Sequence, residues 1–137
     1  MATVRDAMTT NPKTLASSAT VVDAAKLMKA EDAGIVPIVD GDRVTGVVTD
    51  RDIAIKVVAE GKDPHSTTIG DVASSNLVTV DPDQDLDEAL RLMARHQVRR
   101  LPVVEEDGRL VGILAQADVA REGDEERVGE TVEQISQ

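Results

Sequence analysis

The 137-residue sequence contains no cysteine and no aromatic residue: Cys, Trp, Tyr and Phe are all absent. Without cysteine the chain can form no disulfide, no thiolate nucleophile and no cysteine-ligated zinc site. Without aromatic rings it lacks the stacking platform on which proteins hold single-stranded nucleic acids. Hydrophobic residues still make up 41% of the chain. We therefore expect a globular protein whose core consists of Val, Ile, Leu, Ala and Met.

Positive charge is scarce, and no long apolar run is present. The sequence has 15 Lys and Arg against 26 Asp and Glu, a formal net charge of −11. This charge disfavours binding to nucleic acids and to anionic membrane surfaces. No stretch approaches the ~20 apolar residues that span a bilayer, and the first residues do not form an apolar signal sequence. We therefore expect a cytoplasmic protein with no nucleic-acid or membrane partner.

Groupings typical of catalysis or metal binding are also missing from the sequence. The two histidines, His65 and His96, have no companions at metal-ligand spacing. The alternating acids at positions 81–87 lack the Gly and the terminal Glu that a calcium-binding loop requires. There is no Gly-x-x-x-x-Gly-Lys loop and no pair that resembles a nucleophile with its base. The sequence therefore predicts no enzyme, no metal site and no required cofactor.

The most informative feature that is present is an internal repeat. Residues 4–54 align with residues 69–120 at a shift of 65, which becomes 66 after a one-residue insertion in a turn. The first shift pairs Pro37 with Pro102, and the second pairs Asp52 with Asp118. Matches in this order indicate two copies of one structural unit.

Each copy predicts a βαββα unit. A short extended segment (13–15, 77–80) precedes a helix, for which Thr20 and Asp85 are the candidate N-caps. The apolar stripes of these helices are predicted at positions 21, 24, 25 and 28 and at 86, 89, 90 and 93. Hairpins follow, pairing 35–39 with 44–48 and 100–104 with 110–114 through turns rich in Asp and Gly. A last helix is predicted over 50–60 and another from about Gln116.

The repeat also predicts how the chain is organised. We expect an α/β (α+β) fold with the first motif and its following helix in residues 1–62 and the second motif in 63–121. The acidic tail, 122–137, is either a frayed end or a short docking helix. A single unit is too small to stand alone, so the copies are expected to pack sheet to sheet about a pseudo-twofold axis. This packing creates two clefts, each lined by both copies.

The segment Gly46-Val47-Val48-Thr49-Asp50-Arg51-Asp52 lies where a predicted strand gives way to a helix. Free backbone N–H groups at such a junction favour an anion, and Thr49 adds a hydroxyl donor. Asp52 can accept hydrogen bonds from a ribose diol, and Arg51 can bind phosphate. Alternatively, Thr49 or Asp50 is simply an N-cap and Asp52 an acid that favours the helix dipole.

The second copy departs from this pattern. It retains Asp118 but has Ala115 where the first copy has a hydroxyl. Arg99 and Arg100 precede Leu101 and are predicted to compensate by serving the Asp118 cleft, whereas Thr49 and Arg51 serve the Asp52 cleft. Alternatively, both arginines form salt bridges with surface acids. The two clefts are therefore expected to be unequal.

Three features together resemble the CBS domain pair, or Bateman module, over residues 4 to about 120. They are the apolar-Pro-apolar strands (Ile35-Val36-Pro37-Ile38-Val39 and Leu101-Pro102-Val103-Val104), the Gly-x-x-Thr-x-x-Asp segment and the duplication itself. The run Thr49-Asp50-Arg51-Asp52-Ile53 is similar to that of stand-alone bacterial members, including stress- or hypoxia-response CBS proteins.

The resemblance implies a regulatory module that binds AMP, ADP, ATP or a related adenosyl ligand such as S-adenosylmethionine. It implies a homodimer that acts through an unidentified partner protein. The adenine is expected between the sheets near Val36, Val47, Leu101 and Ile113. Thr10 and Thr14 are expected near the Asp118 cleft, and their counterparts Ser75 and Thr79 near the Asp52 cleft. The alternative is a structural or interaction protein that keeps the same dimer fold and binds no nucleotide.

Overall fold

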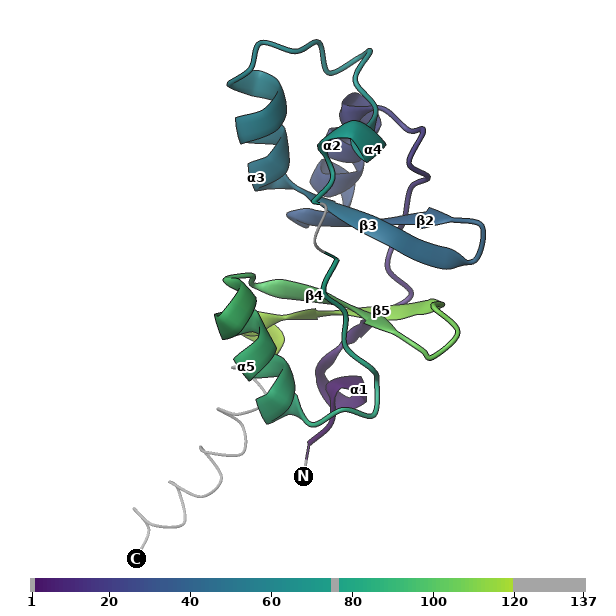
Figure 1. Cartoon of the computed structure of the whole chain (residues 1–137), viewed down its shortest axis with the longest axis vertical. Helices are drawn as coiled ribbons and strands as arrows, with labels where there is room; N and C mark the ends of the chain where they lie inside the picture. The colour runs from purple at the N-terminus through teal and green to yellow at the C-terminus, as the bar shows by residue number, and fades with distance from the viewer. Residues whose placement is uncertain (1, 75–76, 120–137) are drawn as a thin grey trace, which may run out of the picture.

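The computed structural model describes residues 2–74 and 77–119, which form two similar halves (Figure 1). The two sheets lie next to each other in the middle of the molecule, and helices cover their outer faces. The predicted mixed α and β fold with two sheet-containing motifs is thus confirmed. The elements, in chain order, are α1 (Val4–Ala7), β1 (Thr9–Thr10), α2 (Val21–Glu31), β2 (Ile35–Asp40), β3 (Arg43–Thr49), α3 (Asp50–Ile53), η1 (Ala54–Val58), α4 (Ile69–Val72), α5 (Leu86–His96), β4 (Arg100–Val104) and β5 (Leu110–Ala115).

Both predicted hairpins are present. β2 pairs antiparallel with β3, and β4 pairs antiparallel with β5. Gly41 and Gly108 adopt positive φ angles of 66° and 88° in the connecting turns, a conformation that glycine adopts without steric cost. The predicted extended segments form single parallel bridges, Leu15 with Ile38 and Val80 with Val103. Helices α2 and α3 in the first copy, and α5 and the helical residues 116–119 in the second, complete the pattern, so the βαββα order is confirmed in each copy.

The helix N-caps are also confirmed. Thr20 precedes α2, and its hydroxyl accepts a hydrogen bond from the backbone N–H of Asp23 at 3.1 Å. Asp85 precedes α5 and accepts from the backbone N–H of Asp87 at 2.8 Å. These bonds satisfy donors that the first turn of a helix leaves without partners.

Two details of the helices differ from the prediction. Ala25 and Leu90 are exposed, whereas Leu27 and Leu92 pack against the cores, because the face that each helix turns toward its core is displaced round the helix from the predicted one. The helix predicted over 50–60 is not uniformly α-helical. α3 continues into a π-helical turn, η1, in which the Ala59 N–H donates to the Ala54 carbonyl at 2.9 Å. None of the described helices is long and apolar enough to cross a membrane.

The first segment of each copy packs in the other half of the molecule. Val4 of α1 lies in the core of the second half, whereas Ile69 and Val72 of α4 lie in the core of the first. β1 extends the second-half sheet, with Thr9 opposite Ile113 and Thr10 opposite Gly112. The two hydrophobic cores therefore do not follow the boundaries of the sequence repeat, and the halves are intertwined.

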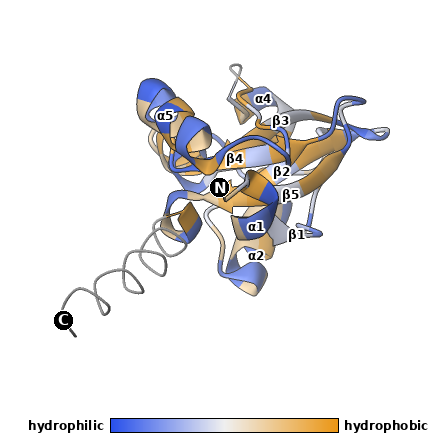
Figure 2. Ribbon diagram, turned by 90° about the horizontal axis from the view of Figure 1, so that it is seen from below, coloured by the Kyte–Doolittle hydropathy of each residue, from blue (hydrophilic) through white to orange (hydrophobic). Residues whose placement is uncertain are grey.

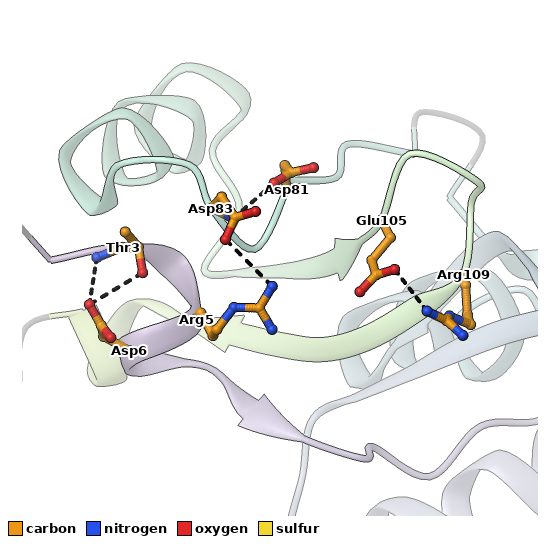
Figure 3. A network of polar contacts seen from close by, with 7 residues as sticks. All are labelled: Thr3, Arg5, Asp6, Asp81, Asp83, Glu105 and Arg109. Atoms are coloured by element: carbon orange, nitrogen blue, oxygen red, sulfur yellow. Dashed lines mark hydrogen bonds and ion pairs between the residues drawn. The ribbon is translucent and has the colours of Figure 1, made fainter.

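Polar contacts secure α1 on the second half (Figure 3). The backbone N–H groups of Val4 and Arg5 donate to the carbonyls of Gln84 and Pro82, at 2.9 and 2.8 Å. The Arg5 guanidinium lies 3.5 Å from the Asp83 carboxylate. The loop that precedes α5 thus holds α1 through two backbone carbonyls and the carboxylate of Asp83.

Hydropathy follows the same arrangement (Figure 2). The strands are mostly hydrophobic, whereas the helices combine apolar and polar faces. The two core clusters are fully aliphatic, and no polar or charged residue among those described is buried. The expectation of an aliphatic core without rings is therefore confirmed, and polar chemistry is confined to partly exposed positions between and around the halves.

Candidate functional site

A cavity of about 250 Å³ lies where β3 passes into α3, and residues from both halves line it. The first half contributes Ile35, Val47 and the turn from Thr49 to Asp52. The second half contributes the segment from Gln97 to Leu101. Ser74 and Val78, which flank the connection between the halves, complete the lining. This cavity brings together half of the polar residues that the sequence singled out: Thr49, Arg51, Asp52, Arg99 and Arg100.

Thr49 and Asp52 form a capping box at the start of α3. The Thr49 backbone N–H and its hydroxyl both donate to Asp52 Oδ2 at 2.9 Å. In return, the Asp52 backbone N–H donates to Thr49 Oγ1 at 3.1 Å. Thr49 and Asp52 therefore do cap the helix, which was the alternative to a ligand-binding role. Capping does not remove them from the cavity wall, because both line it.

The Asp52 carboxylate is largely enclosed, with 14% of its side chain exposed. Its second oxygen, Oδ1, lies 3.1 Å from Lys56 Nζ. A carboxylate offers about four acceptor positions, so this group retains capacity for a further donor.

Three arginines line the same cavity: Arg51, Arg99 and Arg100. The assignment of Arg99 and Arg100 to the Asp118 cleft is therefore wrong. Their backbone belongs to the second half, where the Arg99 carbonyl accepts from the Gln116 N–H at 2.7 Å. Their side chains nevertheless reach the first half. Among the residues that the structure describes, no ion pair includes Arg99 or Arg100, so the salt-bridge alternative gains no support.

Gly34 provides space for one of these arginines. A Cβ atom at this position would lie 3.0 and 3.1 Å from the two terminal nitrogens of Arg100, and 2.7 Å from Asp50 Oδ2. Such distances are too short for van der Waals contact, so any side chain here would displace the guanidinium or the carboxylate. The absence of a side chain at position 34 thus lets a cation and an acid approach the same part of the cavity.

The apolar walls agree only in part with the prediction. Val47 and Leu101 line the Asp52 cavity as expected, whereas Val36 and Ile113 line a different one. Ile35, Val78 and Val98 also line the Asp52 cavity and were not predicted. The repeat could have identified Ile35 as a lining residue, because Ile35 in the first copy aligns with Arg100, a predicted site residue, in the second.

A second cavity, of about 260 Å³, is related to the first by the repeat. Ile113 takes the place of Val47, and Thr10 lines this cavity, as predicted for the second cleft. Asp118 and Ala115 do not line it; Asp118 Oδ2 accepts from the Ala115 N–H at 3.4 Å. Among the residues that the structure describes, the charged ones that line it are Lys13 and Glu31, and none is an arginine. The two clefts are therefore unequal, as expected.

The remaining predicted residues lie outside these two cavities. Thr14 lines a separate open hollow of about 410 Å³ beside the turn at Gly41. Thr79 is partly buried and lines none of these three cavities. Ser75 and the acidic tail lie outside the described residues. The part of the chain that is described contains no group of three or more His, Cys, Asp or Glu residues that could hold a metal ion.

Comparison with known proteins identifies the fold. The CBS domain family model matches twice, at residues 4–59 and 69–125. CBS domain-containing protein YhcV of Bacillus subtilis is 42% identical over 120 residues, which are 88% of this chain and 84% of that protein. Hypoxic response protein 1 of Mycobacterium tuberculosis is 41% identical over 136 residues, which are 98% of this chain and 94% of that protein.

Solved structures agree with this result. A crystal structure of hypoxic response protein I with two coordinated zinc ions is 43% identical, with a TM-score of 0.79 over 89% of this chain and 99% of that one. The CBS domain pair of protein MJ0100, in complex with 5′-methylthioadenosine and S-adenosyl-L-methionine, is 28% identical, with a TM-score of 0.84 over 92% and 98% of the two chains. The chain therefore belongs to the CBS domain family, and its two motifs form a CBS domain pair.

Proposed function

We propose that this protein is a regulatory module that binds an adenosyl-containing ligand, such as AMP, ADP, ATP or S-adenosylmethionine, in the Asp52 cavity. The observation that carries the proposal is the composition of that cavity: three arginines, two carboxylates (Asp50 and Asp52) and two hydroxyl residues (Thr49 and Ser74) meet there beside an aliphatic wall. The adenosyl ligands bound by the MJ0100 CBS pair support the same reading. The protein binds this ligand without transforming it.

Each part of an adenine nucleotide has a suitable partner in the cavity. The flat base fits between aliphatic side chains such as Ile35, Val47 and Leu101. The ribose can donate to Asp52, as a sugar does to the acid of dinucleotide folds. The phosphates can take the planar donor forks of the arginines, which match phosphate oxygens in geometry and charge.

The second cavity is the poorer nucleotide site. Within the described ranges, neither Asp118 nor an arginine lines it, so this part of the chain offers a nucleotide neither an equivalent of Asp52 nor a guanidinium donor there. Lys13 and Glu31 carry opposite charges, which leaves little net attraction for phosphate. We infer that one nucleotide binds per chain.

We further propose that the protein is a cytoplasmic homodimer. Ligand binding to this dimer would change how it contacts a separate partner protein. Ile55 and Val58 of η1 support an interface on this helix, because 48% and 71% of these apolar residues are exposed. Exposed apolar residues on a helix often mark contacts between subunits. Light scattering of the purified protein would measure the dimer, and Val58→Asp should shift it toward monomer.

One observation favours the alternative, a structural or interaction protein without nucleotide binding. Asp52 already caps α3 and pairs with Lys56, so its position has a structural explanation. Calorimetric titration with AMP, ADP, ATP and S-adenosylmethionine separates the two functions. Binding of at least one ligand, with a melting temperature that rises with its concentration, is expected. No heat and no thermal shift with any of the four at millimolar concentration would refute the nucleotide-binding function.

A further inference from the structure

Asp50 places a negative charge beside the arginines of the Asp52 cavity. It lines that cavity together with all three of them. Its position is fixed by two hydrogen bonds: the Asp50 backbone N–H donates to the Gly34 carbonyl at 2.9 Å, and Asp50 Oδ1 accepts from the Arg51 backbone N–H at 2.8 Å. The proposed function gives this carboxylate no role so far, because an acid repels phosphate.

The Asp50 carboxylate and the Arg100 guanidinium border the same small space at Gly34. A Cβ atom at position 34 would lie 2.7 Å from Asp50 Oδ2 and 3.0 Å from the nearer terminal nitrogen of Arg100. Both distances start from one point, so the two groups are at most about 6 Å apart, close enough for their charges to act on each other even in water. A phosphate that binds the Arg100 guanidinium must therefore also come close to the Asp50 carboxylate.

The charges of the described lining residues match a ligand with few phosphates. The three arginines contribute three positive charges. The charge of Asp52 is balanced by Lys56, whose Nζ lies 3.1 Å from Asp52 Oδ1, so Asp50 is the acid that lowers the positive charge from three to two. A nucleoside monophosphate carries about two negative charges near neutral pH, and each further phosphate adds about one more. The extra charge of a di- or triphosphate is left unmatched.

We infer that Asp50 is a specificity-determining residue: its charge makes the Asp52 cavity favour a nucleoside monophosphate over a di- or triphosphate. This inference rests on the proposed adenosyl site. The cavity volume of about 250 Å³ supports it, because it lies below the roughly 300–1,000 Å³ that is usual for small-molecule sites and so favours the smaller ligand. Two unit charges about 6 Å apart in a water-like medium change an equilibrium about threefold, so one carboxylate at this distance can alter ligand preference.

Calorimetric titration of AMP, ADP and ATP tests the inference, at low salt and without divalent cations, which would offset the charge of the added phosphates. Asp50→Asn removes the charge and keeps a side-chain oxygen that can accept from the Arg51 N–H. Asp50→Ala is a second neutral variant should Asp50→Asn fail to fold. Asp87→Asn is the matched control, since Asp87 is also an exposed acid in the first turn of a helix and lines none of the three cavities.

The ratio of two affinities within one variant cancels any general effect of the substitution on the fold. The wild type and Asp87→Asn should bind AMP more tightly than ATP, with the same ratio. In Asp50→Asn the ratio should shift toward ATP by at least about threefold, with ADP between the two. The shift should become smaller at high salt, which screens exposed charges.

Four results would overturn the role of Asp50 alone: ATP bound at least as tightly as AMP by the wild type, an unchanged ratio in Asp50→Asn and Asp50→Ala, an equal shift in Asp87→Asn, or a shift that high salt does not reduce. Binding of S-adenosylmethionine without any of the three nucleotides would also overturn it and would leave the adenosyl site standing. If none of the four ligands binds the wild type, the proposed function fails together with this inference. The two failures are therefore distinguishable.

Discussion

Replacing Asp52 with alanine separates its helix-capping role from its proposed ligand role, because the chain contains a matched control. Asp23 forms the same capping box with Thr20 at the start of α2, and it lines none of the three cavities. Loss of a capping interaction costs about 0.5–2 kcal/mol. The loss of stability in Asp52→Ala should lie near the upper end of this range, since the substitution breaks two hydrogen bonds of 2.9 Å at a mostly enclosed carboxylate. Asp23→Ala breaks one bond of 3.1 Å at an exposed residue and should fall near the lower end.

At roughly 4 °C for each kcal/mol in a chain of this size, both losses are visible as lowered melting temperatures without ligand. A ligand at a hundred times its dissociation constant adds about 2.7 kcal/mol, or roughly 10 °C. Asp23→Ala should keep this rise in full, and Asp52→Ala should lose most of it. Scanning calorimetry with and without saturating nucleotide measures both quantities. An undiminished rise in Asp52→Ala would refute the site, and an equal loss in both variants would show that the site responds only to general destabilisation.

Three further predictions concern the cavity and the first hairpin. Arg100→Gln should weaken nucleotide binding about tenfold and flatten its salt dependence; equal affinities for the variant and the wild type at low salt would contradict this. Gly34→Ala should weaken binding several-fold with an unchanged melting temperature, since only the flexible ends of side chains must move; calorimetric titration and a thermal melt check it together. Hydrogen bonds from the Ser17 backbone N–H and the Thr45 hydroxyl hold the pKa of Asp40 below its usual 3.8. The resulting stabilisation is present at neutral pH and lost as the pH falls below about 3.8. Asp40→Asn should therefore unfold more easily in urea at pH 7 and show a smaller loss between pH 5 and pH 3; parallel pH profiles would count against this reasoning.

Features that depend on neighbouring residues could be predicted from the sequence. The hairpin turns need glycine at positive φ, and Gly41 and Gly108 supply it. The helix starts need a side-chain acceptor within one turn, and Thr20 and Asp85 supply it. Such constraints act over two to four residues, so composition and spacing are enough to reveal them.

The exchange of segments between the halves could not be predicted from such local constraints, although the family resemblance placed Thr10 of the first copy at the second cleft. Nothing local to Val4 or Ile69 indicates which core it enters, because both cores are aliphatic. One residue in the sequence reflects this exchange: Gly112, the glycine in the second copy of the Gly-x-x-Thr-x-x-Asp segment. A Cβ at Gly112 would lie 2.7 Å from Met8 Sδ and 2.8 Å from the Thr9 carbonyl oxygen. The glycine of the second copy is thus required for close approach of β1, a constraint that spans about a hundred residues of sequence.

The placement of Arg99 and Arg100 changes the relation between the two clefts. Arg99, which precedes β4, and Arg100, its first residue, line the cavity whose helix turn belongs to the other copy, so this cavity depends on both copies. By the repeat, Gly34 and Ile35 are the corresponding positions, and Ile35 lines the second cavity without any charge to offer. The second copy's missing hydroxyl, at Ala115, is therefore not compensated by arginines: Arg99 and Arg100 line the cavity of the complete motif, with Thr49 and Asp52. Differences between the copies that suggested compensation in the sequence instead place three arginines, Arg51, Arg99 and Arg100, in one cavity. The two copies have thus kept similar scaffolds, and only the Asp52 cavity has the groups on which the proposed nucleotide site depends, among the residues that the structure describes.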